Sequence, residues 1–354
     1  MTAVFCANAA DRTAETWEGH LAPFDRLEFA VSDAAKGIAK AVADIAAARR
    51  DAPGTPALEH GLDVFHTTME ARRVLARHWR RAEASWEKAE AADVEVARSK
   101  RRGIDARGAA QAARAAWARA IATFERTERL GSAWGRAHAA LELFRADGRL
   151  NDRSHAESEI AEALKGLTGP DWSKVVNFLK DPRGLAFLDR MHRRLESAEP
   201  RREWREAMAW RWWLRHRRVT ASDPVMASVQ AVGRERPLAE AERASYDRVA
   251  AVLGDTVRAS SAVECMNSVL RMQQSRHKRM TQPMLDLKRL YWNCRAFRSG
   301  PRKDVSPYQA LGLDLPTFDF WELLQADPGG LTQRLSTTRN KERDSPLPHA
   351  RKPA

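Results

Sequence analysis

A polar stripe near the end of the chain has residue types and spacing that suit chemistry on a phosphate. Its members stand at i, i+3, i+4 and i+7, so a helix here presents a carboxylate, an amide, a hydroxyl and a guanidinium on one face. Burying such a face costs several kcal/mol unless every group is paired. The stripe therefore belongs to solvent or to a polar site. It consists of Glu264, Asn267, Ser268 and Arg271.

Basic residues follow the stripe, in the pattern that a polyanion favours. The whole chain is basic as well: 60 Lys and Arg against 47 Asp and Glu give a formal charge of +13 over 354 residues. We therefore expect an anionic partner, with nucleic acid ahead of other polyanions. The alternative is an arginine-rich composition that reflects a GC-rich genome. The basic residues behind the stripe are Arg276, His277, Lys278 and Arg279, then Lys288 and Arg289.

Cysteine use and hydropathy predict a cytoplasmic protein. The three cysteines are too few and too scattered for a disulfide framework or a zinc cluster, which fits a reducing compartment. No apolar run approaches membrane-spanning length, and the first residues lack the charged start of a signal peptide. We expect no membrane partner, and association with the nucleoid when the protein is bound to DNA.

Metal-assisted phosphoryl transfer needs carboxylates from separate elements, because Mg²⁺ takes oxygen ligands. Two such ions activate the attacking oxygen and stabilise the leaving one. Asp33, at the end of a predicted strand, and Glu264 are the candidates. For Asp33 the competing interpretation is an N-cap of the helix that starts near Ala35, and one residue could serve both roles.

The elements that must position these residues differ along the chain. The first seventy residues alternate strands and helices, which predicts parallel pairing with chemistry at the carboxyl ends of the strands. Strands are expected over 2–8, 27–33 and 61–66, and helices over 14–24 and 38–50.

From about residue 67 to about residue 253 the apolar spacing predicts six to eight helices. Four tryptophans among arginines in 201–218 have two interpretations: an amphipathic helix with buried tryptophans, which is favoured, or a groove that stacks bases and binds phosphates. Further helices are predicted from Gln282 and from the Ser306 cap, followed by a disordered basic tail.

Several segments together resemble the DDE transposases of bacterial insertion sequences. They are 31–37 (Val-Ser-Asp-Ala-Ala-Lys-Gly), 63–66 (Asp-Val-Phe-His), 260–271, 285–295 and 306–308. The resemblance implies an α/β fold class, a partial ribonuclease H-like fold with a large all-helical insertion. The implied organisation is a partial core over 1–70, the helical insertion over 71–253, C-terminal core helices over 254–325 and a basic tail over 326–354.

The resemblance also implies roles for individual residues. Asp33 and Glu264 would be catalytic and would hold Mg²⁺, and Asp63 and His66 are further candidates, with His66 contacting DNA or the substrate water. A capping or packing histidine is an equal alternative. The implied DNA contacts are Asn267, Arg271, Arg276, His277, Lys278, Arg279, Lys288 and Arg289.

In that family an earlier catalytic aspartate lies on the first strand. If 2–8 is the third strand, that aspartate is expected upstream of Met1, since Asp11 and Asp25 fall in loop or helix-edge positions. The chain is then the C-terminal portion of a DDE transposase, inactive alone, with an upstream fragment or a second copy as partner. The alternatives are a non-catalytic DNA-binding protein and a helical interaction scaffold.

Overall fold

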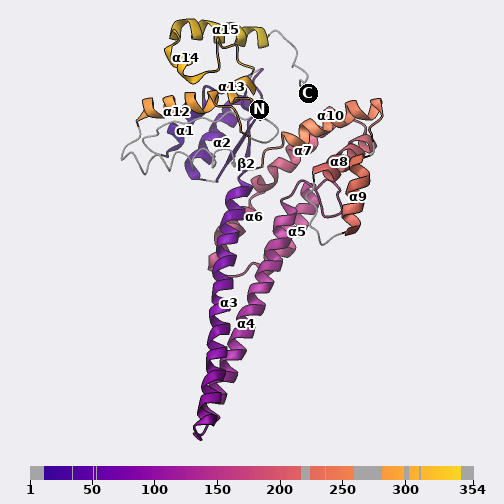
Figure 1. The fold of residues 1–354 in the computed structure, drawn as a ribbon. Coiled ribbons are helices and arrows are strands. Elements are labelled where there is room, and N and C mark those ends of the chain that lie inside the picture. Colours follow the sequence, from indigo (N-terminus) through magenta and orange to yellow (C-terminus); the bar gives the residue numbers. More distant parts are fainter. Residues whose placement is uncertain are drawn as a thin grey trace. The chain divides into compact units, whose positions relative to one another are not determined.

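The computed structural model describes residues 12–33, 35–50, 52, 54–216, 224–235, 237–258, 281–298, 303–310 and 312–343 (Figure 1). These residues belong to two compact units. One unit spans Arg12–Ser261, and the other holds the described residues from 281 onward. Among the described residues, no helix is both long and apolar enough to cross a membrane.

The first unit opens with a small parallel sheet. Strands β1 (Phe29–Ser32) and β2 (Glu59–Leu62) pair in parallel, with Ser32 opposite Leu62. The connection between them is α2 (Lys36–Arg50), and α1 (Ala14–Leu21) precedes β1 and packs on α2. The closeness of this packing depends on Gly37, because a Cβ there would lie 2.0 Å from the backbone oxygen of Arg12.

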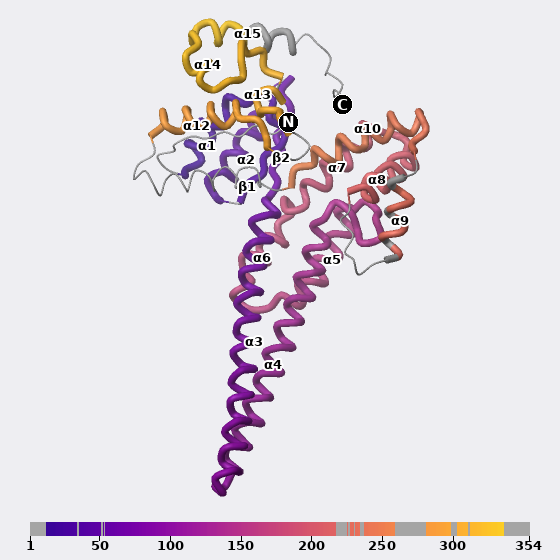
Figure 2. The backbone as a smooth tube through the Cα atoms, in the orientation of Figure 1, coloured from indigo at the N-terminus to yellow at the C-terminus, as the bar shows by residue number. Residues whose placement is uncertain are grey.

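Two long helices, α3 (Val64–Arg101) and α4 (Arg107–Ala140), run side by side as a hairpin (Figures 1 and 2). Helix α3 ends at Arg101, and Gly103 follows its C-cap Arg102 with a φ of +67°, which suits glycine just after a helix C-terminus. Three alanines allow the two helices to approach closely, and Trp86 and Trp117 meet edge to face beside them, 5.0 Å between ring centroids. The alanines are Ala89, Ala116 and Ala120.

The rest of this unit is a helical body around one apolar core. The core buries large side chains such as Trp172, Leu188 and Leu195, and it continues onto the inner ends of α3 and α4. The body consists of α5 (Arg153–Gly166), η1 (Pro170–Trp172), α6 (Ser173–Lys180), η2 (Pro182–Leu185), α7 (Ala186–Ala198), α8 (Arg202–His216), α9 (Pro224–Glu235) and α10 (Glu240–Gly254).

The second unit is a group of C-terminal helices. Its elements are α12 (Gln282–Cys294), α13 (Pro307–Ala310), α14 (Phe320–Gln325) and α15 (Pro328–Arg343). Ser306 begins α13 as the sequence predicts: its hydroxyl accepts from Gln309 N at 3.2 Å, and Gln309 Oε1 accepts from Ser306 N at 2.7 Å. Tyr291 of α12 packs against Phe320 of α14.

The prediction of an α/β, ribonuclease H-like fold is wrong. The described residues are mostly helical, and their one sheet has only the two strands β1 and β2. The physical reason is visible at Asp63, where the predicted strand 61–66 stops and the aspartate begins the long helix α3. The predicted strand 2–8 lies outside the described residues.

The C-terminal segment also differs from the sequence prediction. Helix α15 occupies residues 328–343, within the stretch where a disordered tail is predicted, and residues 344–354 lie outside the described part. Prolines 307 and 328 each stand at the first position of a helix, where the missing N–H is not needed.

Candidate functional site

The carboxyl edge of the two-stranded sheet brings Asp33 and Asp63 to the same place. Because β1 and β2 are parallel and Ser32 lies opposite Leu62, the next residue on each strand emerges at the same edge. The backbone N–H of Asp63 donates to the carbonyl of Ser32 at 2.8 Å, which extends the pairing to this point. Two aspartates that are thirty positions apart in the sequence are therefore neighbours.

Asp63 is a buried capping residue. Its side chain is fully shielded from solvent; Oδ1 accepts from Phe65 N at 2.8 Å, and Oδ2 contacts His66 Nδ1 at 2.6 Å. The first bond satisfies an N–H group in the first turn of α3. The second orients the imidazole of His66, whose side chain is 43% exposed, and assigns any outward chemistry of this ring to Nε2.

Asp33 is exposed at the same edge. Its Oδ1 accepts from Ala35 N at 3.2 Å, which caps the turn ahead of α2 as the sequence allows. Asp33 is exposed, and this is its one hydrogen bond to the described residues, so its carboxylate fits a ligand of a hard cation such as Mg²⁺. Asp63 does not fit this role, because both of its oxygens are buried and hydrogen-bonded. In the described part of the chain, no group of three His, Cys, Asp or Glu side chains is placed to hold a metal ion.

A half-buried imidazole supports the edge from within the sheet. His60 of β2 lies 2.8 Å through Nε2 from Ser32 Oγ and 3.3 Å through Nδ1 from Arg183 Nη1. Arginine only donates, so Nδ1 accepts and Nε2 carries the proton that it donates to Ser32. Burial lowers the pKa of His60, and the charge of Arg183 lowers it further. His60 is thus a neutral side chain that holds Ser32, the last residue of β1, by a hydrogen bond.

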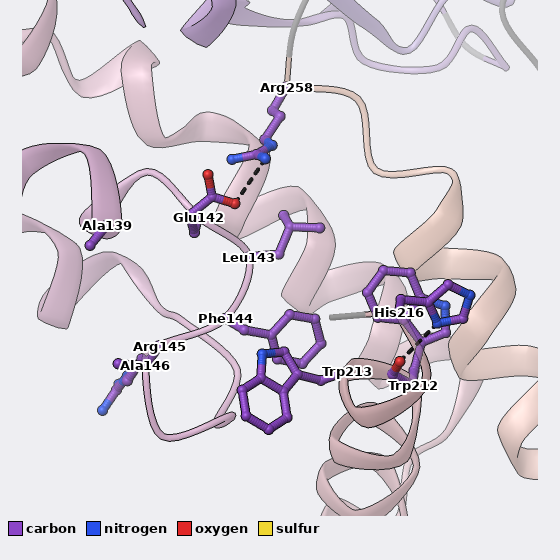
Figure 3. A pocket seen from close by; sticks show the side chains of 10 residues that line it. All are labelled: Ala139, Glu142, Leu143, Phe144, Arg145, Ala146, Trp212, Trp213, His216 and Arg258. Atoms are coloured by element: carbon purple, nitrogen blue, oxygen red, sulfur yellow. Dashed lines mark hydrogen bonds and ion pairs between the residues drawn. The ribbon is translucent and has the colours of Figure 1, made fainter. Parts of the chain in front are cut away.

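The segment after α10 joins this edge to a pocket. The carbonyl of Arg258 accepts from Val64 N at 3.0 Å, directly beside Asp63. The Arg258 guanidinium donates to the carbonyl of Leu141 at 2.8 Å and pairs with Glu142 at 2.8 Å (Figure 3). Sequence reasoning missed Arg258, His60 and Arg183, because no local pattern marks them.

The pocket has a volume of about 410 Å³ and an aromatic wall (Figure 3). Trp212 stacks on Phe144 with 13° between the planes, and on His216 with 18°. The neighbouring Trp213 is buried, whereas Trp210 is 40% exposed. Helix α8 therefore buries Trp213 in the body, as the amphipathic-helix interpretation predicts, but leaves Trp210 exposed. The interpretation as a groove that stacks bases and binds phosphates stays a prediction.

The remaining predicted residues divide into two groups. Lys288 and Arg289 lie on α12 of the second unit, where both are partly buried and Arg289 pairs with Asp286 at 3.2 Å. The others lie outside the described residues, so their roles stay predictions. They are Glu264, Asn267, Arg271, Arg276, His277, Lys278 and Arg279.

Comparison with known proteins gives no relative. No protein family, no curated protein and no solved structure matches this chain.

Proposed function

We propose that this chain is a DNA-acting portion of a DDE-type transposase. In this proposal the basic surfaces bind DNA phosphates, and Asp33 together with Glu264 holds Mg²⁺. The observation that carries the proposal is the parallel register of β1 and β2, which sets an exposed carboxylate beside an oriented aspartate–histidine pair. The assignment of Glu264 rests on the sequence pattern.

The residues at the edge have distinct roles in this proposal. Asp33 supplies an oxygen ligand, and the bound metal would stabilise negative charge that develops on a phosphate. Asp63 is a positioning residue, because it is buried and holds the His66 ring through Nδ1. His66 Nε2 is the atom that would meet a DNA phosphate or a water molecule.

The chain alone is expected to bind DNA without cutting it. A DDE centre uses three carboxylates to clamp two metal ions, whereas the sequence pattern offers two, Asp33 and Glu264. The second candidate function is non-catalytic DNA binding. It is favoured by the burial of Asp63, which removes one of the two edge carboxylates from metal binding.

Asp33→Asn separates these two functions. Asparagine keeps an oxygen that accepts from Ala35 N, so the turn before α2 survives while the charge is lost. The measurement is DNA affinity by fluorescence anisotropy, in Mg²⁺ and in EDTA at equal ionic strength. For a transposase-type site, Mg²⁺ tightens binding of the wild type several-fold, and Asp33→Asn removes this gain but keeps the affinity in EDTA.

The matched control is Asp25→Asn, which removes one exposed carboxylate from the turn between α1 and β1. Its affinity should respond to Mg²⁺ as the wild type does. An equal Mg²⁺ response in all three proteins would leave only the non-catalytic DNA-binding function. Absence of salt-dependent DNA binding at moderate ionic strength would reject both functions and favour the interaction scaffold.

A further inference from the structure

The outer half of α3 and the turn that follows it separate opposite charges. Residues 82–97 of α3 hold five acidic side chains and one lysine, a formal charge of −4. Residues 98–107, at the turn between the helices, hold five basic side chains and one aspartate, a formal charge of +4. We call 98–107 the hairpin tip and 82–97 the acidic shaft. A composition that was merely basic would not arrange its charges in this way.

The cations of the tip are exposed, and most of them lack a carboxylate. Arg98 pairs with Glu95 at 2.7 Å, and Arg107 approaches Asp105 at 3.9 Å. Among the residues that the structure describes, no carboxylate lies within ion-pair distance of the other three basic side chains, which are all exposed. These are Lys100, Arg101 and Arg102.

The hairpin carries this charge away from the helical body. The ion pair between Arg81 and Asp171, at 3.3 Å, marks the end of the body's support on α3. The tip begins 17 residues further along α3, at residue 98, which is about 26 Å at 1.5 Å per residue. Ala89, Ala116 and Ala120 pack α3 on α4 over this length, and Trp117 Nε1 donates to Asp93 at 2.7 Å. The outer hairpin is thus a stiffened support for the tip.

We propose that the hairpin tip binds the phosphodiester backbone of duplex DNA, end-on and without reading sequence. This rests on the proposed DNA-acting function and adds a contact surface to it. Two packed helices make a tip about 20 Å broad, whereas the major groove of B-DNA is about 12 Å wide, so the tip straddles the groove and meets phosphates on either side. The acidic shaft repels a duplex laid along α3, which favours end-on contact at the tip. The neighbouring stretch of α4, residues 108–122, is less charged and holds Arg114 and Arg119 without an acidic residue.

Charge and apolar content both favour DNA over a membrane surface. The tip exposes a single large apolar side chain, Ile104, at 58%. A membrane-binding helix needs a continuous apolar face as well as basic residues, and the tip lacks one.

The test removes three tip charges, in the variant Lys100→Gln/Arg101→Gln/Arg102→Gln. The matched control removes three exposed arginines that already have carboxylate partners: Arg129→Gln/Arg149→Gln/Arg202→Gln. Affinity for a duplex of random sequence is measured by anisotropy at several salt concentrations. Each lost phosphate contact lowers the magnitude of the slope of log affinity against log salt concentration by about 0.9. The slope of the tip variant should therefore be smaller than that of the wild type by up to about 3. At low salt the tip variant should bind DNA about tenfold or more weakly.

Each outcome decides the inference. The inference is supported if the salt slope of the tip variant falls as expected while the salt slope of the control variant changes by less than about 1. Equal losses in the two variants, or an unchanged slope in both, overturn it while the DNA-acting function stands. If the wild type does not bind DNA, the proposed function and the inference both fail. Far-UV circular dichroism verifies that each variant is folded.

Two further probes identify the source of the phosphates. Duplex RNA bound with the same tip-dependent loss supports a backbone contact that is shared by both duplexes. Binding to phosphatidylserine vesicles that the tip variant loses, with DNA affinity unchanged, overturns the inference in favour of a membrane surface.

Discussion

A buried carboxylate between three helices provides a direct test of how the helical body is held. Glu199 follows α7, and its side chain is 1% exposed. Oε1 accepts from Arg201 Nε at 2.8 Å, and Oε2 accepts from Ser245 Oγ and from Arg248 Nη2, each at 2.6 Å. These donors join the end of α7, the start of α8 and the middle of α10. Helix α10 in turn leads to Arg258 beside the sheet edge.

Glu199→Gln keeps the shape of the side chain and removes its charge. The new NH₂ group faces donors instead of accepting from them, so two or three hydrogen bonds to cations and a hydroxyl are lost. Breaking a buried ion pair from one side costs about 3–5 kcal/mol. The two arginines are 57% and 46% exposed and regain water, which reduces the expected loss to about 2–4 kcal/mol.

The assay is thermal and urea unfolding of the wild type and Glu199→Gln. A loss of 2–4 kcal/mol lowers Tm by about 5–10 °C in a domain of this size. The control is Glu206→Gln, which removes an exposed carboxylate paired with Arg202 on α8 and should change stability by less than about 0.5 kcal/mol. Equal effects of the two substitutions would refute the reasoning.

The stability difference between the wild type and Glu199→Gln should also depend on pH, in a direction that follows from the pKa of Glu199. Hydrogen bonds from Arg201 first, and then from Ser245 and Arg248, hold the pKa of Glu199 far below the ordinary value of 4.5. A lowered pKa means that the stabilisation is complete above the pKa of the unfolded chain and is lost as pH falls below it. The stability gap between the wild type and Glu199→Gln should therefore be constant from pH 7 to about pH 5 and shrink below about pH 4.5. A gap that widens in acid would contradict this assignment.

Three further substitutions probe the elements around the candidate site and the hairpin. Gly61→Ala places a Cβ 2.6 Å from the Phe29 ring and should destabilise the chain by about 1–3 kcal/mol in urea unfolding; an unchanged midpoint would mean that the ring moves aside at no cost. Asp63→Ala removes the cap of α3 and should lower the free energy of unfolding by about 1–2 kcal/mol. Asp63→Asn keeps a capping oxygen and should lower it clearly less. Equal losses in the two variants would contradict the capping role. Ala120→Leu adds volume at a fully buried contact and should force α3 and α4 apart. Amide hydrogen exchange should then become faster in the outer hairpin but not in α7. Unchanged exchange in the hairpin would show that it accommodates the added volume.

The elements around Asp33 could be predicted because their signals are local. An apolar run that ends in Ser32 and Asp33 predicts strand β1. The alternation of strands with α1 and α2 predicts that β1 and β2 pair in parallel. The segment 63–66 misled the prediction for an equally physical reason. Val64 and Phe65 favour a strand, but Asp63 caps a helix, and α3 continues for 38 residues with packing on α4 that outweighs local propensity.

The supporting residues of the edge could not be predicted, because their contacts span the chain. Arg183 reaches His60 across 123 positions, and the carbonyl of Arg258 reaches Val64 across 194. Each of these residues is an ordinary arginine or histidine in its own segment. Their roles depend on how the helical body folds back on the sheet, and single-sequence periodicity carries no information on that packing.

The net charge of +13 shows why composition alone does not locate a binding surface. Many of the basic residues have carboxylate partners within the fold: Arg153, Arg190 and Arg248 all hold carboxylates between separate elements. Those cations are already neutralised, and a phosphate must displace a carboxylate to use them. The hairpin tip differs because its basic residues stand together, exposed and next to an acidic shaft. Segregation of charge, rather than its total, is therefore the feature that points to a polyanion, and it becomes visible only when the turn between α3 and α4 is placed between Arg101 and Arg107.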